Sequence, residues 1–529
     1  MRDFHLPGRS AVFATNGMCA TSHPVAAAAA VDVLKAGGNA MDAAIAGAVL
    51  LGLAEPQMTG IGGDCFALVA PAGGGEVIAV NGSGRAPAAT DAAALRAHGH
   101  TTVPEQSAAA ITVPGAIDAF CAMSDRWGKL GLADSLAPAI HYMDTGIPIA
   151  PRVAFDWAND AATLQGEAAR KTYLLANGAV PKPGAVFRLP GNAEVLRRIA
   201  KDGRAAFYEG EVADDMLTAI RAAGGIHTEA DFAASQTTFD APIAADYKGQ
   251  TLLEHPPNGQ GVIAHLMLNM LAHFDIASID PYSADRIHLE TEIAKLAYGA
   301  RNLYLADPDA MGDGLARLAS KELAAELAGR VDMKRALPPK AELAEAVHRD
   351  TIYITVVDKD RMAVSLIYSI FHGFGSGLAS DKFGILLHNR GAGFSLSEGH
   401  PNEIGPGKRP LHTIIPAMLA NAEGRITMPF GVMGGQYQAA GHARMMTNLF
   451  DYGMDIQSAL DAPRSFPENG RLKLERTIPE SVQADLAARG HDAYVPDTPI
   501  GGAQAIVIGD DGVLIGASDP RKDGAAVGY

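Results

Sequence analysis

The first part of the chain alternates between apolar helical segments and short strand-like runs. Residues Ala26–Lys35 and Asp42–Leu53 are rich in alanine and have few polar side chains, which favours two helices separated by a break at Gly37-Gly38. Two shorter runs, Cys65–Ala70 and Glu76–Val80, lie on either side of an Ala-Gly-Gly-Gly turn and predict strands. The pattern therefore predicts a mixed fold of helices and sheet.

The pattern changes twice further along the chain. Residues 118–327 are mostly helical in pattern, with a turn at residues 256–259. Residues 332–349 are rich in Lys, Arg, Glu and Ala and include a Pro-Pro pair, which predicts an exposed, loosely held linker. After Thr351 strands dominate, and glycines are dense in residues 373–435. We find no internal repeat.

One predicted strand begins with a residue that can act as a nucleophile. Residues Asp350–Asp358 alternate apolar and polar side chains as far as a Val-Val pair, which is the period of a half-buried strand, and Thr351 stands at its start. If the bond before Thr351 is cut, its hydroxyl gains a free α-amine as its own general base. An isolated Thr here would ordinarily be only the first β-branched residue of a strand. The nucleophile interpretation therefore depends on the surrounding residues.

Those surroundings form four blocks spread over the chain. The blocks are Thr21–Gly63, with Ala-Gly-Gly-Asn-Ala-Met-Asp and Glu-Pro-Gln-Met-Thr-Gly-Ile-Gly-Gly; Asp350–Gly377, with Val-Ser-Leu-Ile-Tyr-Ser and Phe-Gly-Ser-Gly; Gly384–Gly435, with Pro-Gly-Lys-Arg-Pro and Met-Gly-Gly; and Gly516–Arg521 with the terminal Gly-Tyr. In this order they resemble the γ-glutamyltransferase family of N-terminal-nucleophile hydrolases. Any one block is weak evidence, but together they identify the chain as a member of that family.

The resemblance implies a four-layer αββα fold of the α+β class, built from two subunits of one self-cleaved precursor. Cleavage between Asp350 and Thr351 would leave a large (α) subunit of residues 1–350 and a small (β) subunit of residues 351–529 that begins with the nucleophile. The length of 529 residues alone would suggest about three domains. The family implies one interwoven body instead, and 48% apolar residues suffice for its core.

Matched to the family, four residues form the catalytic machinery. Thr351 falls on the nucleophile, and Ser369 falls where the family places a Thr whose hydroxyl bonds the nucleophile. Gly434 and Gly435 fall on the pair whose backbone N–H groups receive the oxyanion of the tetrahedral intermediate, where glycine permits close approach. Outside this frame, Ser369 would be a structural strand residue and the Gly-Gly pair a turn.

The substrate pocket departs from the transferases. Arg390 replaces a Gln, Gly393 replaces the Asp that pairs with the substrate's α-ammonium group, and Phe371 replaces an Asn that helps to hold the glutamyl head group. The family's Ser-Ser pair becomes His412-Thr413, and its carboxylate-binding arginine corresponds to Arg85, displaced by two positions. We therefore expect Arg85, Arg390, His412 and Thr413 to bind substrate, since a guanidinium suits a carboxylate. The alternative is that both arginines pair with acids of the protein body.

The gain of Arg390 and the loss of the acid at position 393 together predict that the substrate is a small anionic amide without an α-ammonium group. Residues 81–87, 388–391 and 409–413 look like the branch of the family that contains oxamate amidohydrolase. Three alternatives stay open: a γ-glutamyltransferase or glutathione hydrolase proper, an acylase that removes a dicarboxylic side chain from a β-lactam such as a cephalosporin, and an unprocessed, non-enzymatic binding protein. Hydrolysis and transfer to an amine acceptor are both compatible with the sequence.

Charge, cysteines and targeting signals limit the partners. A net charge of −16 argues against nucleic acid or an anionic membrane. The N-terminus has no apolar core of signal-peptide length, and the apolar run Ala43–Ala54 is too short to span a bilayer, so we expect a soluble, cytoplasmic protein.

Cys19, Cys65 and Cys121 have no metal-binding spacing, and neither have the histidines, so we expect no metal and no cofactor. The expected partners are the two subunits themselves, and a homo-oligomer of the processed heterodimer is left open.

Overall fold

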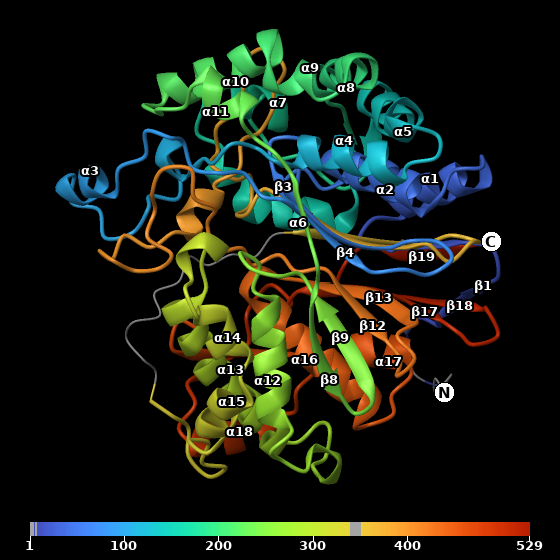
Figure 1. The fold of residues 1–529 in the computed structure, drawn as a ribbon, viewed down its shortest axis with the longest axis vertical. Coiled ribbons are helices and arrows are strands. Elements are labelled where there is room, and N and C mark those ends of the chain that lie inside the picture. Colours follow the sequence, from blue (N-terminus) through green and yellow to red (C-terminus); the bar gives the residue numbers. More distant parts are fainter. Residues whose placement is uncertain (1–4, 6–7, 339–350) are drawn as a thin grey trace.

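Two antiparallel sheets packed face to face form the centre of the computed structural model, which describes residue 5 and residues 8–338 and 351–529. Helices cover the outer face of each sheet, so that four layers follow one another from top to bottom in Figure 1. The αββα architecture expected from the sequence is confirmed. Within the described residues, no helix is long and apolar enough to cross a membrane.

Each sheet has seven strands, and we call them sheet I and sheet II. Sheet I has the order β19 (Ala525–Gly528), β2 (Met18–Thr21), β10 (Ile352–Val357), β11 (Ala363–Ser369), β3 (Asp64–Ala70), β4 (Ile78–Gly82) and β7 (Thr238–Asp240). Sheet II has the order β1 (Val12–Ala14), β18 (Leu514–Ser518), β17 (Gly502–Ile508), β13 (Ile426–Met433), β12 (Ala417–Ala420), β9 (Gln250–Glu254) and β8 (Ile243–Tyr247). Both sheets thus combine strands from before and after residue 350.

Alanine-rich helices pack against sheet I because small side chains let helix and strand backbones approach closely. They are α1 (Pro24–Lys35), α2 (Ala40–Ala54) and α4 (Ala116–Trp127), while α5 (Leu132–Thr145) packs on α2. All 15 residues of α2 are buried, and Asn39 and Asp42 form a capping box at its start. The two helices predicted near the N-terminus are confirmed, each extended by one or two residues at one or both ends.

A second set of helices covers the outer face of sheet II. Helices α12 (Gly261–Leu271), α16 (Gln438–Phe450) and α17 (Ile456–Asp461) contact its strands. Helices α13 (Ala284–Tyr304), α14 (Gly314–Ala319) and α15 (Lys321–Ala328) pack on α12, and α18 (Glu480–Ala488) packs on α13. The remaining elements are peripheral: α3 (Ala92–Ala97), α6 (Pro151–Asp160), α7 (Glu167–Tyr173), α8 (Pro190–Asp202), α9 (Ala205–Tyr208), α10 (Gly210–Ala222), α11 (Glu229–Ala233), β5 (Ile147–Pro148), β6 (Val186–Phe187), β14 (Ser465–Glu468), β15 (Arg471–Leu474) and β16 (Ala493–Tyr494).

Two expectations from the sequence need correction. The mainly helical stretch 118–327 contains the strands β7, β8 and β9, which are short and lie at or near a sheet edge, so that their apolar alternation is weak. The first part of the expected linker is not loosely held. The Leu337 N–H donates to Glu292 Oε2 over 2.7 Å, and the Ala336 N–H donates to the Arg489 carbonyl over 2.8 Å. Residues 339–350, including Asp350 at the expected cleavage point, lie outside the described residues.

Candidate active site

Three polar side chains stand in a row at one edge of sheet I. In the antiparallel register Ile352 pairs with Tyr368, and Ser369 pairs with Asp64, so Thr351, Ser369 and Asp64 occupy neighbouring positions on three adjacent strands. Residues paired in this way point to the same face of a sheet. The Thr351 hydroxyl donates to Ser369 Oγ over 3.4 Å, and all three side chains are buried. The structure therefore brings the expected nucleophile and its hydroxyl partner together.

The backbone just after β11 fixes the Ser369 hydroxyl. The Phe371 N–H donates to Ser369 Oγ over 2.9 Å, so this oxygen acts as an acceptor. Phe371 has a φ of 78°, a left-handed conformation that is uncommon for a bulky residue. Such strain persists only where the surrounding structure enforces it, and it is frequent at functional sites.

Sheet II closes the site from the opposite side. Tyr353, Ile367 and Phe66 lie one step of the pleat further inside sheet I, and they form a core cluster with Met433 of sheet II and with Ile414, which precedes β12. A Cβ on Gly431 would lie 2.4 Å from the Tyr353 ring, so the two sheets are in close contact here. The residues that follow Met433 and precede Ile414 come together beside this cluster, since the Gln260 amide donates to the carbonyls of both Thr413 and Gly435.

Those following residues are the two glycines expected to form the oxyanion hole. Gly434 has a φ of 117° and Gly435 a φ of 56°, both left-handed. A Cβ on Gly434 would lie 2.7 Å from the Gly501 Cα, so only glycine fits there. No described residue accepts a hydrogen bond from the backbone N–H of Gly434 or Gly435. Two adjacent unused donors are the arrangement that a developing oxyanion requires.

Asp64 organises a buried polar cluster that the sequence analysis does not identify. Its Oδ2 lies 3.1 Å from His388 Nδ1, 3.3 Å from His412 Nε2 and 3.4 Å from Arg390 Nε, while its Oδ1 accepts the Gly84 N–H over 3.1 Å. Burial alone would raise the pKa of Asp64, but the two histidines hold it well below its usual range. This carboxylate is ionised and fully surrounded. The sequence does contain a signal for this cluster, because Asp64 is an acid at the first position of β3, whose other residues are apolar.

Arg390 is the least satisfied group in this cluster. Its side chain is 0% exposed, its Nε is poorly aligned with Asp64, and among the described residues none accepts a hydrogen bond from its two terminal nitrogens. The guanidinium carbon lies 4.4 Å from the centre of the Phe371 ring. Burial lowers the pKa of Arg390 to about 10, so it stays charged at neutral pH. A buried cation with unused donors indicates a place for an anion.

The other expected substrate residues differ in their positions. His412 lies in the cluster, where its Nε2 is 2.8 Å from the Ser83 hydroxyl, and burial lowers its pKa to about 3, so it is neutral. Thr413 is buried beside it, and its carbonyl accepts the Gln260 amide over 2.8 Å. Arg85 is 42% exposed, lies 3.5 Å from Asp307 and donates to the Gly407 carbonyl. Arg85 therefore pairs with an acid of the protein body in this structure, and its role in binding substrate stays a prediction.

One cluster elsewhere has metal-ligand chemistry. Within the described part of the chain, His288, Glu292 and His491 place one ligand atom each within 4.8 Å of one another. The Lys295 ammonium lies 2.7 Å from Glu292 and already balances its charge, while the His288 and His491 rings bond each other over 2.8 Å. Sequence spacing cannot detect this group because His491 is distant in sequence. The expectation that the protein uses no metal remains a prediction.

Comparisons with known proteins show which proteins the chain as a whole resembles. The family model described as gamma-glutamyltranspeptidase matches residues 26–529. A glutathione hydrolase-like YwrD proenzyme from Bacillus subtilis is 34% identical over 527 residues, which cover 98% of this chain and 99% of that protein. An oxamate amidohydrolase proenzyme from Klebsiella pneumoniae is 33% identical over 531 residues, covering 97% and 99% respectively. The crystal structure of cephalosporin acylase from Bacillus halodurans matches with a TM-score of 0.91 and 37% identity, covering 100% of this chain and 99% of that one.

Proposed function

Since the chain belongs to the gamma-glutamyltranspeptidase family and is an amidohydrolase or acylase of that type, we propose that Thr351 is its nucleophile and that its substrate is a small amide bearing a carboxylate. Oxamate is the simplest such molecule. The observation that supports this substrate class is Arg390, a fully buried guanidinium with two unused terminal nitrogens beside the nucleophile row.

The proposed first stage is self-processing. The Thr351 hydroxyl attacks the Asp350 carbonyl, the acyl group moves from the Thr351 nitrogen to its oxygen, and water hydrolyses the resulting ester. The products are a chain of residues 1–350 with a new carboxylate and a chain of residues 351–529 with a free α-amine. The names of the two proenzyme relatives support this step, as does the position of Thr351 at the start of a buried strand.

In the second stage the mature enzyme cleaves an amide. The α-amine of Thr351 takes the hydroxyl proton while Oγ1 attacks the substrate carbonyl, and the N–H groups of Gly434 and Gly435 receive the oxyanion. The ammonium returns its proton to the leaving nitrogen, so that ammonia or an amine departs and an ester to Thr351 remains. Water attacks this ester and regenerates the hydroxyl. Ser369 holds the nucleophile in place through its hydrogen bond with Thr351.

The same arrangement argues against a γ-glutamyl head group. Its α-ammonium would need a carboxylate in the pocket, and the charge of the acid there, Asp64, is already faced by the Arg390 guanidinium and two histidines. A substrate with a carboxylate and no ammonium group fits the unused donors of Arg390.

A second candidate is an acylase that removes a dicarboxylic acyl group from a larger amine. The likeness to cephalosporin acylase along the whole chain favours it, and such an acyl group would place its distal carboxylate on Arg390 in the same way. The two candidates share the nucleophile and the acyl-binding side, and they differ in the size of the leaving group.

The test is an intact mass under denaturing conditions, followed by a screen of amides. We expect two chains that meet between Asp350 and Thr351, and we expect product release from oxamate or glutaryl amides but not from glutathione. A single uncut chain without turnover would contradict the proposal. Cleavage of glutathione in preference to the carboxylate amides would contradict the assignment of Arg390.

A further inference from the structure

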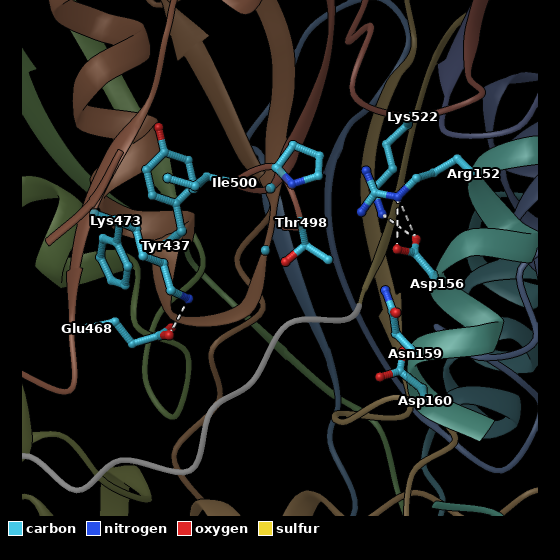
Figure 2. Close-up of a pocket in the computed structure, with 14 residues that line it drawn as sticks. Arg152, Asp156, Asn159, Asp160, Tyr437, Glu468, Lys473, Thr498, Ile500 and Lys522 are labelled. Carbon is cyan, nitrogen blue, oxygen red and sulfur yellow. Dashed lines mark hydrogen bonds and ion pairs between the residues drawn. The ribbon is translucent and has the colours of Figure 1, made fainter. Parts of the chain in front are cut away.

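A second charged region lies on the other side of the oxyanion glycines. Figure 2 shows a pocket bounded by α6 on one wall and by residues 466–473 on the opposite wall, with the loop 498–501 between them. Gly434 and Tyr437 also line it. Helix α6 precedes residue 350, whereas the other wall follows it, so the pocket lies between the two expected subunits.

Lys522 is the unusual residue of this pocket. Its side chain is only 5% exposed, yet its Nζ lies 3.8 Å from the Asp156 carboxylate and donates a hydrogen bond to no residue that the structure describes. Asp156 is already engaged, because Arg152 Nε lies 2.8 and 2.9 Å from its two oxygens. The neighbouring Asp523 carboxylate accepts the Arg152 N–H over 2.9 Å at the start of α6. Because Arg152 already occupies Asp156, the Lys522 ammonium, which lines the pocket, keeps donors that an anion entering the pocket can accept.

The stem of Lys522 lies close to the oxyanion hole. A Cβ on Gly502 would lie 2.9 Å from the Lys522 Cγ, so this glycine leaves space for the lysine. Gly502 pairs with Met433, the residue directly before Gly434. The ammonium group thus projects into a space that Gly434 itself lines.

Strand order places this lysine opposite Arg390. In sheet I, β19 lies two strands from β10 on one side, and β3 with Asp64 lies two strands from β10 on the other. Ala525 pairs with Thr21, and Thr21 pairs with Ile354, so Lys522, just before β19, reaches the same sheet edge as Thr351. At about 4.8 Å per strand, the backbones of Lys522 and of Asp64, the acid beside Arg390, lie roughly 10 Å from that of Thr351 on opposite sides.

We propose that this pocket binds the amine half of the substrate, and that Lys522 binds a carboxylate on that half. The substrate class is then an N-acyl amino acid with one carboxylate on the acyl side, at Arg390, and one on the amine side, at Lys522. This inference rests on the proposed function and refines it, because it assigns the leaving group as an amino acid or a related aminocarboxylate rather than ammonia.

The experiment compares three leaving groups on one acyl group. Oxamate, N-ethyloxamate and N-oxalylglycine release ammonia, ethylamine and glycine, and the matching glutaryl amides repeat the series. Lys522→Met keeps the aliphatic stem over Gly502 and removes the charge. We expect its kcat/KM for the glycine amides to fall at least tenfold more than for the other two, mainly through KM. Lys522→Arg should restore most of the preference.

The matched control is Lys382→Met, since Lys382 is 52% exposed and pairs with Glu211 far from the pocket. It should change none of the three rates. Equal loss with all three leaving groups, or no loss with any, would overturn the role of Lys522. No turnover of any amide by the wild type would instead overturn the proposed function.

A second measurement needs no variant. With the wild type hydrolysing oxamate, glycine should inhibit, or accept the acyl group, at least tenfold more effectively than ethylamine. Equal effects of the two amines would contradict a carboxylate site in the pocket.

Discussion

Two buried acids flank the nucleophile, and they are held in opposite states. On the β3 side, Asp64 has a pKa well below its usual range because His388 and His412 face it. On the β2 side, Glu55 accepts a hydrogen bond from Ser22, and burial raises its pKa to about 7 although Lys522 acts against the rise. The first acid is permanently charged, whereas the second changes charge near neutral pH.

The two acids differ because the two sides of the site differ in how closely they are enclosed. The β3 side is closed: Asp64 and Arg390 are both fully buried and face each other at 3.4 Å, which suits one small anion in one orientation. The β19 side borders a pocket lined by pairs of opposite charge, Arg152 with Asp156 and Lys473 with Glu468. We therefore expect strict selection of the acyl group and wider tolerance for the amine.

The largest loss of activity should come from removing the Thr351 hydroxyl, which lies between the two sides. Thr351→Ala should leave an uncut chain, and its amide turnover should fall on the order of 10⁶-fold, as for other lost nucleophiles. Intact mass and product release measure both effects. Thr351→Ser keeps a hydroxyl and should still be processed. A Thr351→Ala protein that splits and turns over would refute the mechanism.

Removing the cation on the closed side should have the next largest effect. Arg390→Ala should raise KM for a carboxylate amide about 100-fold, because truncating one partner of a buried charge pair costs about 2–5 kcal/mol. Processing should change far less, since Asp350 is not bound through Arg390 in the proposed mechanism. Steady-state kinetics and intact mass separate the two effects.

Arg425→Ala is the matched control, because Arg425 is 65% exposed and pairs with Asp510 at the surface. Arg390→Lys keeps the charge but not the planar fork, and its KM should fall between those of the wild type and the Ala variant. Equal damage to processing and KM in Arg390→Ala would mark the arginine as structural.

A smaller effect should follow from neutralising the acid on the same side. Asp64→Asn keeps an acceptor for the Gly84 N–H but loses the charge that faces Arg390. We expect KM for a carboxylate amide to rise about tenfold, which corresponds to about 1.4 kcal/mol of positioning energy. Kinetics combined with thermal unfolding measure this. Lower stability with unchanged KM would assign Asp64 to the fold alone.

The last prediction concerns the acid on the open side, and it affects the pH dependence of stability rather than catalysis. Burial raises the folded-state pKa of Glu55 from about 4.5 to about 7, so the native state holds this proton more tightly than the unfolded chain. The resulting stability is present below pH 4.5 and is lost as pH rises to 7, by at most about 3 kcal/mol. Glu55→Gln should remove this slope, while Lys522, Asp156 and Asp523 around it remain. Identical pH profiles of the melting temperature would contradict the shift.

Sequence patterns predict the central part of this site better than its sides. The alternation of apolar and polar residues predicts the strand that begins after Thr351. The family resemblance supplies the predicted roles of Thr351, Ser369 and the glycine pair 434–435. The four-layer fold and both N-terminal helices are confirmed. Strands β7 to β9 are not predicted, because each is short and joins a sheet edge formed by residues far along the chain.

The two sides depend on contacts that no local pattern records. Asp64 is an acid in an apolar strand, but only the register of β3 with β11 shows that it stands beside Ser369 and faces Arg390. Lys522 comes directly after a family motif that ends at Arg521, but the sequence does not show that its ammonium lacks acceptors. This can be seen only in the structure, where α6 and β17 pack around the lysine. Arg85 shows the converse, since its motif suggests a ligand and its contacts show a partner in Asp307.

The interleaving of the two sheets has a consequence for how the protein can be recovered once it unfolds. Strands from both sides of residue 350 alternate in each sheet, so neither half contains a complete sheet. The uncut chain finds its partners within one molecule, and its folding equilibrium does not depend on concentration. After a cut at Thr351 the same contacts join two molecules, and refolding becomes a second-order reaction whose yield falls with dilution. The severed peptide bond would thus act as a one-way step, after which the enzyme persists by unfolding slowly rather than by folding again.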